Sequence, residues 1–493
     1  MLFQTIGRGR ERMREVILIQ TCKQSVLTES YKDRYPYPPI GLQYLMAMMK
    51  MHGYRVHLID LYLNPCSKNE FVEKLKNLEK PILFALSSYT DSITHAYLVA
   101  KTIKSVFPNT TIVIGGSHTT FMYQKALYDC KEIDYVSIGE GEATLIELLE
   151  YITYGYPCIE KIKSIAYRDC TGRVCCTERR NYITNLDIMP LLYYPPELIE
   201  FVQKDGGLLF VSSRGCPGEC IFCASRALSG NKYRYHSAEW IASLLYYYYE
   251  VIGYKTFSPL DDTFTVNFHR LRKVSKYIQQ LGYHKKFSWS CKSRVDVINE
   301  KIAKMLQYSG CISMHIGVES GDPEVLATIN KHITLEQVFK SIEILAKHNI
   351  RAECSFILGH PTDNKVSMEK TAILSNMLDT TSFSIGVIGI CTPFPGTVIA
   401  QNRDEYGMKY EITEWKKFDI ATPIFSTKEF TTDDVRRSYY YCLYGYRTSM
   451  EHPGIVEWDY KAYRENIANY IEKVENIVKE RKREEGNVKD KVY

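Results

Sequence analysis

The sequence predicts an α/β protein with two parallel sheets in series and a helical C-terminal region. The first sheet is expected to be doubly wound, and the second to form a partial (β/α)6 barrel of the TIM type. Two observations predict this: short β-branched runs alternate with helical patterns through the first part of the chain, and the alternation resumes from Gly207 for six repeats. The length of 493 residues also exceeds one domain. The expected boundaries are 1–155, 156–200, 201–425 and 426–493.

The first domain is expected to contain five strands and four helices. Each predicted strand is short, β-branched and bounded by turn residues, and the connections between elements are short. That pattern favours a parallel sheet whose ligand lies beyond the carboxyl ends of the strands. The expected strands are Val16–Gln20, Val56–Leu61, Ile82–Ser87, Thr111–Gly115 and Tyr135–Ile138, and the expected helices are Gly41–His52, Asn69–Leu78, Ser92–Val106 and Ala143–Ile152.

Three successive strand ends of this domain carry small or polar residues. Paired glycines after a strand are a weak signal when taken alone, because tight turns use them routinely. Together, the three ends predict a broad cleft, since the sequence has no phosphate-binding G-x-x-x-x-G-K-[ST] loop and no dinucleotide fingerprint. The residues concerned are Ser87, Ser88, Gly115, Gly116, Gly139 and Gly141.

A connector with a small hairpin around Thr171-Gly172, made by Ile165–Arg168 and a segment near Tyr182, is expected before the barrel. The barrel strands are then predicted from their β-branched runs, and polar residues follow most of them. The expected strands are Leu208–Ser212, Thr256–Leu260, Phe287–Cys291, Ser313–Val318, Ala352–Leu358 and Phe383–Ile390, and the expected helices are 238–252, 268–281, 299–308, 335–348 and 367–378. Beyond residue 425 the pattern is helical, and 479–491 is expected to be a solvated, charged tail.

Three cysteines, Cys216, Cys220 and Cys223, follow the first barrel strand in the run R-G-C-P-G-E-C-I-F-C. The surrounding glycines and proline make a tight loop that can bring the thiolates to one metal centre. No fourth cysteine lies nearby, whereas a structural zinc site needs four protein ligands. A four-iron cluster held by three thiolates leaves one iron open to another ligand. The spacing therefore favours a catalytic cluster, with zinc as the remaining alternative.

Candidate polar groups follow later barrel strands. Asp261, in the run P-L-D-D-T-F-T, could bind an ammonium group or cap the next helix. Arg294 suits a carboxylate partner, although a salt bridge with Asp296 competes. Glu319 ends the fourth strand in I-G-V-E-S-G-D.

The motif Cys-x3-Cys-x-aromatic-Cys after a strand resembles the radical S-adenosylmethionine superfamily. The resemblance implies a [4Fe-4S] cluster on the three cysteines, which would be both the metal ligands and the catalytic residues. Its open iron would chelate S-adenosylmethionine and, once reduced, cleave it to a 5′-deoxyadenosyl radical. The resemblance also implies a ribose contact for Glu319 and adenine contacts at the strand ends of Gly359 and Pro393. The implied contacts to S-adenosylmethionine are Phe222, Asp261, Arg294, Glu319, Gly359 and Pro393.

The segment with P-Y-P-P-I-G-L-Q-Y-L, I-V-I-G-G-S-H and I-G-E-G-E resembles the cobalamin-binding domain at the front of one radical S-adenosylmethionine branch. The resemblance implies that Ser87 or Ser88, with Gly115 and Gly116, lines the site for the nucleotide tail, and that Gly139 and Gly141 border it. The motif Asp-x-His-x-x-Gly is absent after the first strand, which implies cobalamin without a protein histidine on cobalt. His95 and His118 are expected to be ordinary helix or loop residues.

With both cofactors, the resemblance implies a cobalamin-dependent methyltransferase acting on an unactivated carbon of a small-molecule or peptide substrate. It also implies an electron donor such as flavodoxin or ferredoxin. The alternative is a cyclase or rearrangement enzyme that transfers no methyl group. A non-enzymatic cobalamin sensor is disfavoured by the intact cysteine triad.

The composition limits which binding partners and which cellular compartment are expected. The chain has 62 basic and 57 acidic residues, a net charge of +5 and no basic stripe, so nucleic acid is not expected as a partner. No run approaches the ~18 apolar residues of a membrane span. The start of the chain lacks the apolar core of a signal peptide, and the 15 cysteines fit a reducing cytoplasm.

Overall fold

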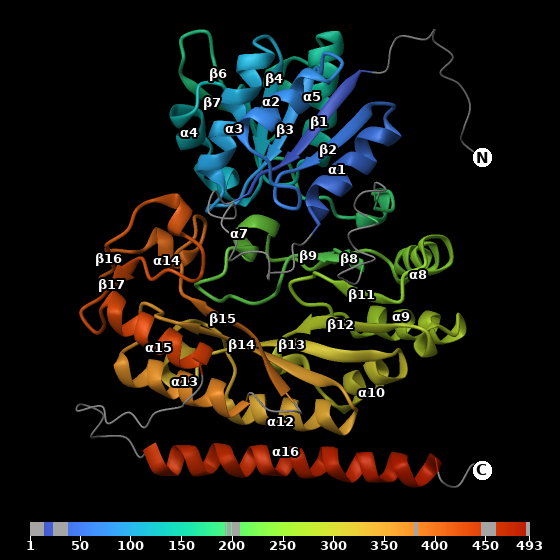
Figure 1. The fold of residues 1–493 in the computed structure, drawn as a ribbon, viewed down its shortest axis with the longest axis vertical. Helices are drawn as coiled ribbons and strands as arrows, with labels where there is room; N and C mark the ends of the chain where they lie inside the picture. The colour runs from blue at the N-terminus through green and yellow to red at the C-terminus, as the bar shows by residue number, and fades with distance from the viewer. Residues whose placement is uncertain are drawn as a thin grey trace. The chain divides into compact units, whose positions relative to one another are not determined.

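The computed structural model describes residues 14–22, 38–192, 194, 199, 208–378, 383–444 and 460–489. Figure 1 shows the ribbon. The chain forms two compact units, one of Met1–Thr184 with Ile188–Leu198 and one of Asn185–Asp187 with Ile199–Tyr493. Gly207, where the second alternation was expected to start, and the rest of 201–207 lie outside the described residues.

The first unit is built on a seven-stranded sheet in the order β2-β1-β3-β4-β5-β6-β7. The pairs from β2 to β5 are parallel, and β6 and β7 add an antiparallel edge. The doubly wound sheet predicted from the sequence is confirmed. Its elements are β1 (Glu15–Gln20), α1 (Ile40–Met51), β2 (Arg55–Asp60), α2 (Lys68–Lys76), β3 (Leu83–Ser87), α3 (Ile93–Val106), β4 (Thr111–Gly115), α4 (Ser117–Asp129), β5 (Tyr135–Ser137), α5 (Glu142–Tyr154), β6 (Ile165–Arg168) and β7 (Val174–Cys176).

The hairpin of the predicted connector belongs to this sheet. β6 pairs with β5 through Ile165 and Ser137, and its other partner is β7 rather than a segment near Tyr182. The compact unit therefore continues to Thr184 instead of ending at residue 155. The apolar residues of β1 are fully buried, as expected for a central parallel strand, and Val16 and Leu18 pack with residues of α1 and α5.

The second unit contains an open, curled sheet of six parallel strands in the order β15-β14-β13-β12-β11-β8. This confirms the predicted partial barrel. Polar side chains cap several of its helices, which sets where those helices begin. Its main elements are β8 (Leu208–Phe210), α8 (Ala238–Tyr246), β11 (Thr256–Pro259), α9 (Phe268–Gln280), β12 (Ser288–Ser293), α10 (Glu300–Tyr308), β13 (Cys311–Glu319), α11 (Pro323–Thr328), α12 (Leu335–Lys347), β14 (Arg351–Leu358), α13 (Lys365–Leu378) and β15 (Phe383–Ile390).

Alternation along the central strands distinguishes the two faces of this sheet. Met314, Ile316 and Val318 of β13 are completely buried, whereas His315 and Gly317 between them are half-buried. Leu358 of β14 packs among residues of α13, so the fully buried set faces the helices. The half-buried set therefore lines the inner face of the curled sheet, where a barrel of this type places its ligands.

The C-terminal part of this unit is helical. α15 (Thr432–Tyr444) packs on α13, a small β16–β17 hairpin (Lys409–Tyr410 and Phe425–Ser426) precedes it, and α16 (Tyr460–Lys489) runs beside α12, as Figure 1 shows. The expected solvated tail is thus helical as far as Lys489. Alternating charge permits this, since i,i+4 pairs stabilise an exposed helix.

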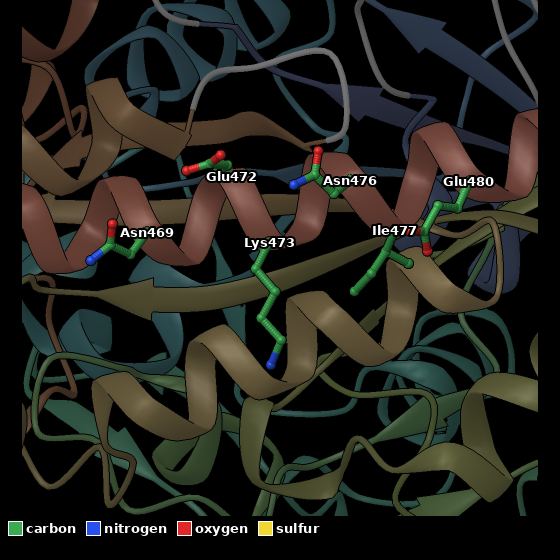
Figure 2. A pocket seen from close by; sticks show the side chains of 6 residues that line it. All are labelled: Asn469, Glu472, Lys473, Asn476, Ile477 and Glu480. Atoms are coloured by element: carbon green, nitrogen blue, oxygen red, sulfur yellow. The ribbon is translucent and has the colours of Figure 1, made fainter.

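α16 is held to α12 by an aromatic pair and an ion pair. The rings of Phe339 and Tyr470 stack with centroids 4.3 Å apart, and the ammonium of Lys473 lies 2.7 Å from the carboxylate of Glu343. Figure 2 shows Lys473 directed toward the neighbouring helix, along a shallow depression lined by residues of α16. Among the helices of the described residues, none is long and apolar enough to cross a bilayer.

Replacing Tyr470 with alanine should lower the free energy of unfolding of the second unit by about 1–2 kcal/mol, because the stacked pair with Phe339 is lost. Glu472→Ala, at an exposed position of the same helix, is the control and should change it by less than about 0.5 kcal/mol. Chemical denaturation measures both values. Equal effects of the two variants would show that α16 does not dock through this pair.

Candidate active site

The three cysteines lie in a loop between β9 (Ser213–Arg214) and the short helix α7 (Ser225–Ser229). Gly215 opens the loop with a φ of +88°, and a Cβ there would lie 2.6 Å from the carbonyl oxygen of Lys232, so glycine is required. Backbone amides face two of the sulfurs: Gly218 N is 3.4 Å from Cys216 Sγ, and Ser225 N is 3.5 Å from Cys223 Sγ. Amide donors of this kind favour the thiolate form that binds metal.

The thiols of this loop do not form a site for one ion. Within the part of the chain that the structure describes, no three His, Cys, Asp or Glu side chains converge on one position. A tetrahedral zinc site requires such convergence, whereas cysteines that hold a four-iron cluster each bind a different iron and stand farther apart. The described residues therefore show no preformed four-ligand zinc site at this loop.

Arg294, at the carboxyl end of β12, lies against the cysteine loop. Its Nη1 is 4.0 Å from Cys220 Sγ, and its Nη2 donates to the carbonyl oxygen of Lys331 at 3.1 Å. A Cβ on Gly218 would come within 2.6 Å of Nη1, so the glycine makes room for the guanidinium. The ion pair with Asp296 also forms, with Nε to Oδ1 at 3.0 Å and Nη2 to Oδ2 at 2.9 Å. Arg294 thus lies beside the cysteine loop and also forms the salt bridge with Asp296 that the sequence offered as the alternative.

Glu319 ends β13 with a φ of +73°, an uncommon conformation for a residue other than glycine. Its carboxylate is buried and lies 2.7 Å from the ammonium of Lys331, which is equally buried. Gly317 leaves the space that this pair occupies, because a Cβ there would lie 2.7 Å from the Lys331 ammonium. The pair fixes the orientation of Glu319 and leaves its second oxygen without a recorded partner in the described residues.

Asp261 does not have a free carboxylate for a cofactor. Its Oδ1 accepts from the backbone amides of Ser212 at 2.6 Å and Ser213 at 3.0 Å, and its Oδ2 accepts from both serine hydroxyls at 2.6 Å. Complete burial raises the pKa of Asp261, which the serine donors and the guanidinium of Arg270, 3.9 Å away, oppose. Its role is to anchor the start of the cysteine loop. Asp262 is exposed and bonds to Ser225 beside Cys223, so the structure favours Asp262 as the carboxylate at this site.

The aromatic residue of the motif, Phe222, lies against His360, with ring centroids 5.2 Å apart. His360 is fully buried, burial lowers its pKa to about 3, and neither ring nitrogen has a recorded hydrogen-bond partner among the described residues. Gly359, with a φ of +75°, lets Val435 approach to 3.0 Å from where a Cβ would be. Pro393 lies in the loop after β15. The ends of β14 and β15 are therefore closely packed, and the buried carboxylate of Asp363 accepts a hydrogen bond from the His360 amide at 2.8 Å.

In the first unit, the predicted serine and glycine positions meet at adjacent strand ends. Ser88 N donates to the Gly115 carbonyl oxygen at 3.2 Å, across the ends of β3 and β4. A Cβ on Gly116 would collide with the carbonyl oxygen of Ser88, and its φ of +114° also requires glycine. This contact leaves the edge free of side chains. The hydroxyl of Ser88 is fully buried without a recorded partner in the described part of the unit.

Gly139 and Gly141 form the neighbouring edge after β5. Gly139 has a φ of +77° and its amide donates a hydrogen bond to Thr120 Oγ1 at 3.0 Å, while Gly141 precedes α5. Beside them the hydroxyl of Ser137 is buried and has no recorded partner within the described residues. A ligand with hydrogen-bonding groups would satisfy the two buried hydroxyls, of Ser88 and Ser137, and the glycines leave space for it at this edge. The residues therefore fit the tail of cobalamin.

The two histidines of the first unit have structural environments. His95 in α3 lies with Nδ1 3.3 Å from the Cys22 amide, and burial lowers its pKa. His118 in α4 faces Thr90 Oγ1 at 3.2 Å, and burial lowers its pKa to about 4. Neither follows β1, where the cobalt-binding motif would stand, in agreement with their expected roles.

Sequence reasoning missed Lys331, His360 and Ser137. Lys331 lies away from the residues that it contacts, whereas Ser137 and His360 stand close to predicted strand-end residues, Gly139 and Gly359. His360 directly follows Gly359, so its position beside a predicted strand end was an available signal. For Lys331 the sequence offers no comparable signal.

Two family models match the chain. The B12 binding domain matches residues 31–149, and the Radical SAM superfamily matches residues 210–374. The matched segments fall in the first and the second compact unit, respectively.

Curated relatives extend over most of the chain. An uncharacterized methyltransferase of Pyrococcus horikoshii is 32% identical over 409 residues, covering 81% of this chain and 85% of the relative. An anaerobic magnesium-protoporphyrin IX monomethyl ester cyclase of Rubrivivax gelatinosus is 26% identical over 397 residues, covering 79% of this chain and 70% of the relative.

Solved structures share the fold at low identity. The radical S-adenosylmethionine methyltransferase TsrM of Kitasatospora setae, with tryptophan substrate and an S-adenosylmethionine analogue bound, gives a TM-score of 0.68 at 15% identity and covers 81% of this chain and 79% of its own. The cobalamin-dependent S-adenosylmethionine radical enzyme OxsB gives a TM-score of 0.64 at 19% identity, covering 80% of this chain and 56% of its own.

Asp261→Ala should lower the free energy of unfolding of the second unit by about 3 kcal/mol or more, because two amides and two hydroxyls lose their acceptor and a buried guanidinium loses its counterion. Asp262→Ala, one residue away and exposed, should change it by less than about 1 kcal/mol. Urea unfolding followed by circular dichroism compares the two variants. A stable Asp261→Ala protein would mean that this carboxylate is not the anchor of the loop.

Proposed function

Because the chain belongs to the family of radical S-adenosylmethionine enzymes with a B12-binding domain, we propose that it methylates an unactivated carbon of a small-molecule or peptide substrate. The proposed cofactors are cobalamin, a [4Fe-4S] cluster and S-adenosylmethionine. The observation that carries the proposal is the cysteine loop, with three thiols and a guanidinium at the carboxyl ends of the barrel strands.

Cys216, Cys220 and Cys223 would hold the cluster through three of its irons. When bound and reduced, such a cluster supplies one electron to the sulfonium of S-adenosylmethionine, which breaks a carbon–sulfur bond and gives a deoxyadenosyl radical. Arg294 stands beside Cys220 and favours negative charge at that edge of the loop. Gly218 permits that approach, so the loop and the guanidinium act as one unit.

The remaining proposed contacts to S-adenosylmethionine differ in the part of that molecule that each would bind. Glu319 is oriented by Lys331 and offers a carboxylate oxygen to ribose hydroxyls. Asp262 offers a carboxylate for the methionyl ammonium, because the carboxylate of Asp261 is occupied by Ser212 and Ser213. Phe222, Gly359 and Pro393 provide apolar or backbone surface for adenine, and the neutral His360 stands behind Phe222.

The first unit would bind cobalamin at the edge formed by the ends of β3, β4 and β5. Ser88 and Ser137 supply buried hydroxyls with no recorded partner among the described residues, and Gly116 keeps the edge open to a ligand. Ser87, Gly115, Gly139 and Gly141 complete the edge. An electron donor such as flavodoxin or ferredoxin is part of the proposal, because each reductive step needs an electron that the chain does not supply.

A cyclase or rearrangement enzyme is the second candidate. The 26% identity with the magnesium-protoporphyrin IX monomethyl ester cyclase, over 79% of this chain, is the observation that favours it. The same cofactor residues would serve that reaction, so the site described above does not choose between the two. The products do.

Cluster-reconstituted, cobalamin-loaded protein should form 5′-deoxyadenosine from S-adenosylmethionine and a reductant. S-adenosylhomocysteine accompanying it in the presence of substrate supports methylation, because methyl donation leaves that product. 5′-Deoxyadenosine without S-adenosylhomocysteine would support cyclisation or rearrangement. Absence of both products would contradict either reaction. Liquid chromatography with mass detection measures both nucleosides.

Cys220→Ala should remove roughly one four-iron cluster per chain and abolish formation of 5′-deoxyadenosine, while cobalamin binding persists because the proposed pocket lies in the other compact unit. Cys176→Ala is the matched control, since Cys176 is an exposed thiol of β7 outside the loop. Iron and sulfide analysis and the cobalamin absorption spectrum report the two sites separately. S-adenosylmethionine cleavage by Cys220→Ala would refute the cluster assignment.

A further inference from the structure

A row of charged and polar side chains crosses three adjacent strands of the curled sheet. Lys292 of β12 pairs in register with His315 of β13, which pairs in register with Glu353 of β14. Side chains at paired positions point to the same face of a sheet. The row therefore presents an ammonium, an imidazole and a carboxylate side by side.

The row faces the inside of the barrel. Its neighbours along each strand, Cys291, Met314 and Cys354, are at most 1% exposed and belong to the helix-facing side, whereas all three members of the row are half-buried. Ser355, two residues beyond Glu353, shares a hydrogen bond with Nε2 of His315, which confirms the common face. The inner face of a barrel sheet is where substrates of such folds lie.

The two charges of the row have no counterion within the described residues. No hydrogen bond or ion pair is recorded for the ammonium of Lys292 or the carboxylate of Glu353 in that part of the chain. The imidazole of His315, on the strand between them, bonds to Ser355 of β14 and reaches toward Gly386 of β15, where a Cβ would lie 3.0 Å from the ring. Burial lowers the pKa of His315, which keeps the ring neutral near pH 7. Half-buried charges without partners carry a desolvation cost that a ligand of opposite charge removes.

The row lies next to the proposed S-adenosylmethionine contacts. Lys292 is two residues before Arg294 and His315 is four before Glu319 on their strands. At a rise of about 3.3 Å per residue, these separations correspond to about 7 and 13 Å. A molecule bound on the row would therefore lie within the same barrel and below the site where the radical is proposed to form.

We propose that this row binds the substrate of the radical reaction, and that the substrate is a zwitterion of the α-amino acid class. Its carboxylate would pair with Lys292 and its ammonium with Glu353. The row spans two strand spacings, about 10 Å between the outer Cα atoms, from which both long side chains reach inward. The space between the two side chains therefore suits an ammonium and a carboxylate carried on one carbon better than the widely separated termini of a peptide. The inference rests on the proposed function, because it names the substrate of that reaction.

The first test needs no variant and no turnover. Calorimetric titration of cluster-reconstituted, cobalamin-loaded protein with each proteinogenic L-amino acid should show saturable binding of at least one. The N-acetyl derivative and the carboxamide of that amino acid should each bind about 30-fold or more weakly, because each leaves one charge of the row unpaired. Failure of every free amino acid to bind, or unchanged affinity of either derivative, would overturn the proposal.

Substitutions of the row residues test whether the amino acid binds at this row. Lys292→Met and Glu353→Gln should each weaken binding of that amino acid by about 30-fold or more. Lys301→Met and Glu336→Gln, at exposed positions of α10 and α12, are the matched controls and should bind as the unmodified protein does. Thermal melting checks that all four variants fold. Normal affinity in either row variant would refute the assignment of the row.

The outcomes separate this inference from the proposed function. Protein that forms 5′-deoxyadenosine but binds no free amino acid would retain the radical function and refute the substrate class. Protein that binds an amino acid through the row but cleaves no S-adenosylmethionine would retain the row as a binding site and refute the radical function.

Discussion

The buried carboxylate of Asp261 determines where the cysteine loop leaves the barrel sheet. It accepts hydrogen bonds from the amides and hydroxyls of Ser212 and Ser213, which follow the first barrel strand and lead through β9 into the loop. Arg270 completes the network by donating to the carbonyl oxygen of Ser212 at 3.0 Å. Because four donors converge on the Asp261 carboxylate and Arg270 holds the neighbouring Ser212 carbonyl, the loop has a fixed origin, and the positions of Cys216 and the later thiols follow from it.

The far side of the loop is fixed by Arg294 and by small residues. The guanidinium reaches Cys220 only because Gly218 has no side chain, and it is itself held by Asp296 and the carbonyl oxygen of Lys331. Lys331 also orients Glu319, so one lysine connects the cysteine loop to the carboxylate at the end of β13. Parallel strands bring these groups together, since their carboxyl ends share one edge of the sheet. The first unit uses the same principle, with bare glycine edges and buried hydroxyls in place of charges.

The sequence predicted both sheets and the cysteine loop because those signals are local. Strand and helix periodicity, turn residues and the spacing from Cys216 to Cys223 can all be recognised within short windows. What it could not predict depends on distant contacts. Asp261 and Asp262 are neighbours of identical chemistry, and only the folded chain shows that Ser212 and Ser213 engage the first. The hairpin of β6 and β7 was assigned to a connector because its pairing with β5 is a tertiary choice. The role of Lys331 depends on the folded chain, which turns its side chain back onto Glu319.

The central claim is that three thiolates hold a four-iron cluster whose open iron binds S-adenosylmethionine. The most direct measurement is the electron paramagnetic resonance spectrum of the reduced, reconstituted protein before and after addition of S-adenosylmethionine. The account predicts the signal of a reduced [4Fe-4S] cluster whose g values shift on addition, because the ligand coordinates the open iron directly. A cluster signal that S-adenosylmethionine leaves unchanged, or protein that binds zinc and no iron, would contradict it.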